Sequence, residues 1–120
     1  MSAEKNCIFC KIVRGEIPCQ KVFESDDILV FRDIHPVAPV HLLMIPKEHV
    51  ESMADLEDRH AEVMGRIMIL AQKVAAEQGS VDGFRLIVNT GKVGLQDVYH
   101  LHAHVLGGLK PLPGMIAHAE

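Results

Sequence analysis

The sequence predicts an α+β fold in which one long helix packs on a mainly antiparallel sheet of four or five short strands, with a short helix near the N-terminus. Two observations predict it. Short apolar runs are separated by turn residues, and one longer stretch carries a helical repeat. A chain of 120 residues suits one hydrophobic core. We therefore expect residues 1–120 to form a single domain, with an irregular tail over about 109–120.

The composition favours a soluble globular protein without a nucleic-acid or membrane partner. Hydrophobic residues make up 48% of the chain, and 12 Lys and Arg against 16 Asp and Glu leave a net charge of −4. The basic surface that nucleic acid requires is therefore missing. The polar N-terminus does not look like a signal peptide, and no apolar run reaches the roughly 20 residues that span a bilayer. Three cysteines, an odd number, argue against a disulfide framework. We expect a cytoplasmic protein.

The first third of the chain predicts a short helix followed by a hairpin. The helix covers Cys10–Val13 and ends near Gly15 and Pro18, which are both helix-breaking residues. Two short apolar runs, 20–24 and 28–32, follow on either side of a Ser-Asp-Asp turn, which is typical of a hairpin.

The middle of the chain predicts a strand, the long helix and a further strand. The strand covers His41–Ile45 and stops at Pro46. The helix runs from Asp55, which can cap its start, to Gln78, and Gly79 can end it. The next strand covers 83–89. Apolar residues recur at helical spacing at Val63, Ile67, Leu70 and Val74, with Met64, Met68, Ala71 and Ala75 beside them. The second apolar face hints at contact between two copies of the chain.

Three histidines alternate with apolar residues over 99–108, Tyr-His-Leu-His-Ala-His-Val-Leu-Gly-Gly. A period of two predicts a strand with His100, His102 and His104 on one face. Four residues of strand span about 13 Å, whereas two ligands of one zinc ion lie only about 4 Å apart. His100 and His104 are therefore not expected to share a metal.

The central imidazole is a candidate covalent nucleophile. Imidazole has an ordinary pKa of about 6.5, so it is mostly neutral and nucleophilic at pH 7. His102 could therefore attack a substrate, and a flanking histidine could donate hydrogen bonds to an anion. The alternative is that all three are ordinary core or surface histidines.

The Cys-x-x-Cys pair Cys7 and Cys10 could bind a metal or take part in redox chemistry. Redox chemistry would favour a βαβ context, and none follows. A metal would need two more ligands, which His49 and His100 could supply, and a closed four-coordinate zinc site would be structural. The alternative is two ordinary buried thiols.

The string over 99–108 resembles the signature of the histidine triad (HIT) family of nucleotide hydrolases and transferases. It is most similar to the Hint branch of bacterial type, the purine nucleoside phosphoramidases, and the resemblance extends from about Cys7 to about His118. It implies a HIT-like fold, a homodimer, an AMP-type purine nucleotide substrate and no organic cofactor. It also implies a structural zinc ion on Cys7, Cys10, His49 and His100.

The resemblance further implies roles for residues around the phosphate and the nucleoside. His41 and His104 would lie near the phosphate, with His102 as the nucleophile. Asp33 would hold the ribose hydroxyls, and a carboxylate suits a vicinal diol because it accepts two hydrogen bonds; on sequence alone it could also be a loop-capping residue. Apolar residues would line the base pocket at Phe9, Ile12, Ile17, Phe31 and Ile34.

The loop before the triad implies further phosphate contacts, and it departs from the Hint pattern twice. Asn89 and Gln96 would contact the phosphate. Leu95 stands where a glycine is usual, and Asp97 stands where a serine that donates to the leaving group is usual. An ionised Asp97 can only accept hydrogen bonds, so it could accept from a leaving amine, or carry a proton if protonated.

These expectations combine into one function. We expect a nucleotide hydrolase that cleaves adenosine 5′-phosphoramidates through a nucleotidyl-histidine on His102, releasing AMP and an amine. Two alternatives remain: a dinucleoside polyphosphate hydrolase or nucleotidyl transferase of the same family, and a non-catalytic protein that binds nucleotide or zinc.

Overall fold

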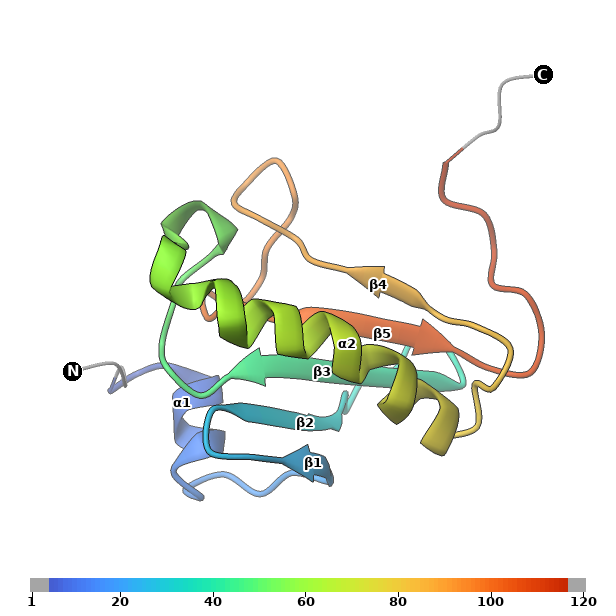
Figure 1. The fold of residues 1–120 in the computed structure, drawn as a ribbon, viewed down its shortest axis with the longest axis horizontal. Helices are drawn as coiled ribbons and strands as arrows, with labels where there is room; N and C mark the ends of the chain where they lie inside the picture. Colours follow the sequence, from blue (N-terminus) through green and yellow to red (C-terminus); the bar gives the residue numbers. More distant parts are fainter. Residues whose placement is uncertain (1–4, 117–120) are drawn as a thin grey trace.

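The computed structural model describes residues 5–116, which form a five-stranded sheet with one long and one short α-helix (Figure 1). Neighbouring strands are antiparallel and follow the order β1-β2-β3-β5-β4. The strands are β1 Lys21–Glu24, β2 Ile28–Arg32, β3 Val40–Pro46, β4 Arg85–Ile87 and β5 Ala103–Gly107. The predicted α+β fold and the hairpin of its first two strands are thus confirmed.

The long helix α2, Ala61–Glu77, crosses one face of the sheet (Figure 1). Its buried side chains Ile67, Ala71, Val74 and Ala75 pack on strand residues of alternating position, as the helical repeat predicted. The strand residues of this larger core are Ile28, Val30, Val40, Leu42, Met44, Ala103 and Val105.

This helix starts later than predicted. Asp55 does not cap it, because Asp55 lies in a separate 3₁₀ turn, η1 (Met53–Asp55), whose N-cap is Ser52. A second 3₁₀ turn, η2 (Asp58–His60), follows and leads into α2. Between the two turns Leu56 has extended backbone, with φ −71 and ψ 142, so a continuous helix cannot pass through it.

The end of α2 agrees with the prediction. Gly79 has φ +109, a conformation that side chains rarely adopt. Its N–H donates to the carbonyl oxygen of Ala76 at 3.1 Å, and the N–H of Ser80 donates to that of Ala75 at 2.9 Å. These two bonds form a Schellman motif.

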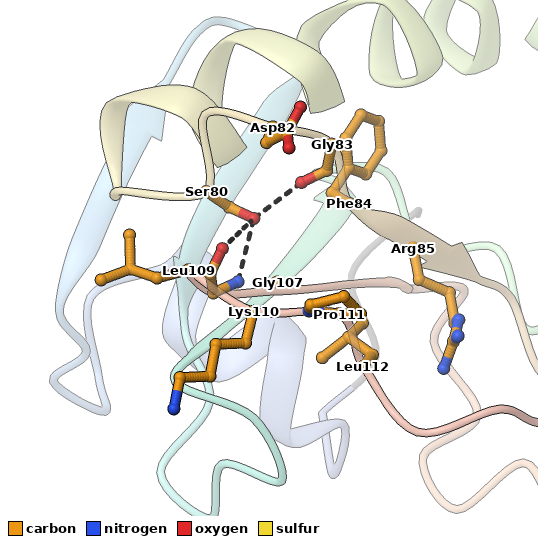
Figure 2. Close-up of a pocket in the computed structure, with 11 residues that line it drawn as sticks. Ser80, Asp82, Gly83, Phe84, Arg85, Gly107, Leu109, Lys110, Pro111 and Leu112 are labelled. Atoms are coloured by element: carbon orange, nitrogen blue, oxygen red, sulfur yellow. Dashed lines mark hydrogen bonds between the residues drawn. The ribbon is translucent and has the colours of Figure 1, made fainter.

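The buried hydroxyl of Ser80 ties the end of α2 to the end of β5 (Figure 2). It donates to the carbonyl oxygen of Gly83 at 2.7 Å and accepts from the N–H of Gly108 at 2.9 Å. A Cβ on Gly107 would lie 2.1 Å from Ser80 Oγ, so only glycine fits there. These contacts hold the end of the strand that carries His104.

Two strands are shorter than predicted. Of the histidines in the stretch over 99–108, only His104 lies in β5. The segment before β5 leaves the sheet, since the N–H of Leu101 donates to the carbonyl oxygen of Val50 at 2.7 Å. Strand β4 pairs only with residues 104–106 of β5 and stops short of the predicted range 83–89.

The opposite face of the sheet is partly covered by the short helix α1, Ile8–Val13. It begins before the predicted Cys10, because Cys7 Sγ accepts the N–H of Cys10 at 3.3 Å and caps the helix. Gly15, with φ +81, follows its last turn. The buried residues of this second core are Phe9, Ile12, Leu29, Phe31, Leu43 and Ile45.

Among the described residues, no helix has both the length and the apolar character needed to cross a membrane. Helix α2 leaves Met68 and Ile69 64% and 80% exposed. The homodimer that the resemblance implies stays a prediction.

Candidate active site

Two histidines face each other on the side of the sheet opposite α2. His41 on β3 and His104 on β5 come from adjacent strands, with His41 Nε2 2.9 Å from His104 Nδ1. The N–H of Val37 donates to His41 Nδ1 at 3.1 Å. This assigns the His41 proton to Nε2, from where it is donated to His104 Nδ1. The neutral His104 then carries its own proton on Nε2, ready to donate to an anion.

Asp33 lies beside this pair, at the edge of a cavity. Its Oδ2 is 3.3 Å from His41 Nε2, and its Oδ1 accepts the N–H of His35 at 2.8 Å. The cavity of about 570 Å³ is lined by Asp33, Ile34 and His41, among others. A carboxylate next to an open cavity can accept hydrogen bonds from a neutral polar ligand such as a diol.

His102 is buried, and one of its nitrogens is held by the backbone. Its Nδ1 lies 2.8 Å from the carbonyl oxygen of His100, which can only accept, so Nδ1 carries the proton. The Nε2 lone pair is therefore free, with Asp97 Oδ1 as its carboxylate neighbour at 3.5 Å. The ring of Phe9 packs edge-on against His102 with centroids 5.2 Å apart, and His104 lies on another side at 5.0 Å.

Burial keeps the His41–His104 pair neutral. It lowers the pKa of His41, against the opposing effect of Asp33. It also lowers the pKa of His104, which the neighbouring His102 and His41 lower further. Each neutral ring has one N–H donor and one acceptor nitrogen, as the hydrogen bonds from Val37 to His41 and from His41 to His104 require.

We expect His104 to make the protein less stable in acid. Between the ordinary pKa of about 6.5 and the lowered native pKa, the unfolded chain binds a proton that native His104 does not. The free energy of unfolding therefore falls as the pH falls through this range, by about 1.4 kcal/mol for each unit of lowering, and the loss is complete below the native pKa.

Urea unfolding of the wild type and His104→Gln, at about pH 7.5 and about pH 5, tests this. The wild type should lose more stability than the variant on acidification. Equal losses would contradict the prediction, since all other titrating groups are shared.

Four predicted metal ligands meet where α1 approaches the segment before β5. Cys7 Sγ and Cys10 Sγ lie 3.3 and 3.5 Å from His100 Nδ1, and Cys10 Sγ lies 3.3 Å from His49 Nδ1. The four ligand atoms all lie within 4.8 Å of one another. Zn–S and Zn–N bonds of about 2.3 and 2.0 Å place tetrahedral ligands about 3.5 Å apart. The donor set and its spacing thus fit zinc.

The orientation of His100 supports this fit. Its Nε2 donates to the carbonyl oxygen of Pro46 at 2.8 Å, which leaves the Nδ1 lone pair facing the two sulfurs. Burial lowers the pKa of His100 to about 4, so the ring is neutral and able to bind a metal. His104 lies away from this set, in contact with His41 instead.

The loop between β4 and β5 is fastened by Gln96. Its side-chain Nε2 donates to the carbonyl oxygens of Glu51 and Val98 at 2.7 and 3.0 Å, and its Oε1 accepts the N–H of Gly91 at 3.0 Å. Leu95 has φ +60, the conformation that favours glycine, which explains why glycine suits this position.

The remaining predicted residues are spread between the core and the surface. Asn89 and Ile17 are half-buried, and Ile34 is exposed at the Asp33 cavity. The buried Phe9, Ile12 and Phe31 belong to the second core.

Sequence reasoning missed the backbone groups that set the histidine tautomers. These are the carbonyl oxygens of Pro46 and His100 and the N–H of Val37. Backbone groups occur at nearly every residue, so no residue type signals them.

Comparisons with known proteins identify the family. The family profile described as "Scavenger mRNA decapping enzyme C-term binding" matches residues 6–118. The chain is 46% identical over 112 residues to the purine nucleoside phosphoramidase of Escherichia coli (strain K12), which covers 92% of this chain and 93% of that protein. It is also 46% identical over 103 residues to adenylylsulfatase HINT1 of Arabidopsis thaliana, over 84% of this chain and 70% of that protein.

Solved structures give the same result. A HIT family hydrolase from Legionella pneumophila Philadelphia 1 is 50% identical with a TM-score of 0.83, over 88% of this chain and 95% of that one. A zinc-bound histidine triad family protein from Mycobacterium smegmatis is 32% identical with a TM-score of 0.76, over 87% and 76%. With a matching profile over nearly its whole length and relatives of almost half identical sequence, the chain belongs to the histidine triad family.

Proposed function

We propose that this HIT family hydrolase cleaves the P–N bond of adenosine 5′-phosphoramidates, releasing AMP and an amine through a nucleotidyl-histidine on His102. One observation carries the proposal: the His102 Nδ1–H donates to the His100 carbonyl oxygen, so Nε2 presents a lone pair. Binding alone does not require an imidazole whose Nε2 lone pair is oriented in this way, whereas a nucleophile depends on it. The E. coli relative named a purine nucleoside phosphoramidase supports an amine leaving group.

The reaction takes place in two displacements. His102 Nε2 forms a bond to the α-phosphorus, while the P–N bond breaks and the leaving nitrogen departs with the electron pair and a proton from solvent. Water then attacks the phosphorus and gives up a proton to solvent, the electron pair of the Nε2–P bond returns to Nε2, and AMP leaves. In both displacements His104 Nε2–H donates to a non-bridging oxygen, and the His41 Nε2–H···His104 Nδ1 bond fixes its orientation.

The nucleoside would occupy the cavity beside Asp33. The carboxylate accepts from the ribose hydroxyls, and Ile34 lies at the cavity mouth. We propose that Phe9, Ile12, Ile17 and Phe31 support the base from the second core, where they already pack. We propose that Asn89 and the N–H groups of the loop contact the phosphate, and that Gln96 contributes by holding the loop.

Cys7, Cys10, His49 and His100 would hold a zinc ion. With all four positions filled by protein, the ion supplies structural stabilisation and no open coordination site for substrate. The residues themselves then fix α1 against the segment that carries His102.

Mass spectrometry of a covalent intermediate tests the proposed reaction. The protein is mixed briefly with the lysyl or tryptamine conjugate of adenosine 5′-phosphoramidate and denatured in alkali, because a phosphorus–imidazole bond is labile in acid. We expect a gain of one adenylyl group on the peptide that contains His102, together with free amine and AMP.

Three results would contradict the proposal in different ways. Amine release without an adduct would contradict the covalent mechanism. Faster cleavage of a diadenosine polyphosphate would favour the alternative hydrolase. Neither adduct nor amine, with AMP still bound, would favour a non-catalytic nucleotide-binding protein.

A further inference from the structure

One carboxylate lies beside the nucleophilic nitrogen of His102. Asp97 Oδ1 is 3.5 Å from His102 Nε2, while its side chain is 77% exposed. The same oxygen accepts the N–H of Val98 at 2.9 Å, which holds the carboxylate on the side of His102. A group so close to Nε2 is also close to any phosphorus atom that Nε2 attacks.

The loop that carries Asp97 is built to hold it there. Gln96, next to it, is 7% exposed and bonds the backbone of Glu51, Gly91 and Val98. A Cβ on Gly94 would lie 2.6 Å from backbone atoms of Thr90, so the loop is closed tightly on itself. The position of Asp97 is therefore a feature of the fold, although its carboxylate is open to solvent.

Asp97 also lines a hollow of its own, of about 430 Å³. The contacts Asp33–His41–His104–His102–Asp97 form a row, in which the nucleoside cavity lies at the Asp33 end. The hollow lies at the other end, and its charged side chains are Asp97, Glu51 and Lys5. Two carboxylates and one ammonium give the lining of this hollow a net negative charge.

We propose that Asp97 is a specificity-determining residue that selects substrates whose leaving nitrogen is protonated in the transition state over those whose leaving group is an anion. This inference rests on the proposed function. The nitrogen of a phosphoramidate takes up a proton from solvent as the P–N bond breaks, so it carries positive charge in the transition state beside Asp97, and it leaves as a neutral amine once the electron pair of the bond has passed to it. The carboxylate accepts its N–H and attracts its charge. A leaving sulfate or phosphate gains negative charge at the same place, and the carboxylate repels it.

The selection concerns only the first displacement. Both kinds of substrate give the same adenylyl-His102, and the second displacement by water is identical for both. Asp97 thus changes the relative rates at which substrates form one intermediate, which is a difference in kcat/KM.

Three adenylyl substrates with different leaving-group charge test the proposal: the lysyl phosphoramidate, the tryptamine phosphoramidate and adenylyl sulfate. Asp97→Asn keeps the size and the acceptor for the Val98 N–H but removes the charge. We expect the ratio of kcat/KM for the lysyl substrate to that for adenylyl sulfate to fall about tenfold in Asp97→Asn. Added salt should lower this ratio in the wild type and change it little in the variant.

Asp82→Asn is the matched control, because Asp82 is an exposed carboxylate beside Ser80 and Gly83, outside the row of contacts. It makes the same change of net charge and should leave the ratio unchanged. An unchanged ratio in Asp97→Asn, or an equal loss on all substrates, would overturn the inference while the hydrolase remains. If the wild type cleaved none of the three substrates, the proposed function would fail, and the inference with it.

Discussion

His102→Ala is expected to abolish turnover of an adenosine phosphoramidate while AMP still binds. We expect kcat to fall by about 10⁴-fold or more, since removing the nucleophile of a covalent enzyme can cost about 10⁶-fold. The cavity that we propose for the nucleoside is lined by Asp33, Ile34 and His41 and does not include His102, so AMP should keep most of its affinity. The variant should also fail to form the adenylyl adduct.

The measurement is steady-state hydrolysis alongside AMP binding by calorimetry. His35→Ala is the control, because the His35 side chain is exposed and lies outside the row of histidine contacts. It should retain nearly normal kcat. Turnover by His102→Ala within tenfold of the wild type would exclude His102 as the nucleophile.

The separation of the histidines could be predicted from strand geometry. Their spacing implied that His100 and His104 serve different groups, and in the structure His100 faces the two cysteines while His104 faces His41. The prediction of separate roles was correct although the three histidines do not all lie in one strand. Only His104 lies in β5, yet the two side chains belong to separate clusters of potential metal ligands.

The protonation pattern could not be predicted from the sequence. The nitrogen that carries the His102 proton depends on the His100 carbonyl oxygen, and that of His41 depends on the Val37 N–H. Both contacts follow from local backbone turns, which are not encoded by one residue type. The 3₁₀ turns before α2 escaped prediction for a similar reason, because the apolar repeat gives no sign of where the backbone becomes extended at Leu56.

At Leu95 the sequence predicted part of what the structure shows. The Hint-like pattern favours glycine where this chain has Leu95, and the backbone there does adopt φ +60. The departure was visible in the sequence, whereas the conformation that makes it costly was not. Leucine in this region is strained by roughly 1 kcal/mol, and the neighbouring Gln96 bonds the surrounding backbone.

Cys10→Ser is expected to remove bound zinc and to lower the melting temperature strongly. Cys10 Sγ is the atom that approaches both His49 and His100, and the residue is 1% exposed. A structural zinc ion contributes its binding free energy to folding. For a domain with its own core we expect a loss of several kcal/mol, which corresponds to about 10 °C or more.

Cys19→Ser is the matched control, because it makes the same substitution at a half-buried cysteine outside the ligand set. Metal content and thermal unfolding, each with and without a chelator, are the measurements. The wild type and Cys19→Ser should hold one zinc per chain and lose stability with chelator, whereas Cys10→Ser should hold less zinc and respond weakly. Equal zinc content and equal melting temperatures in the two variants would contradict the site.

Cys10→Ser should also affect catalysis, because His100 links the candidate metal site to His102. His100 contacts Cys7 of the candidate metal site through its side chain, and its carbonyl oxygen accepts from His102 Nδ1 over 2.8 Å. Loss of zinc therefore loosens the group that orients the nucleophile, while the nucleoside cavity, which contains none of the four ligands, stays formed. We expect Cys10→Ser to lower kcat more than it raises KM, measured well below its melting temperature. A change in KM alone would mean that the metal site and the orientation of His102 are independent.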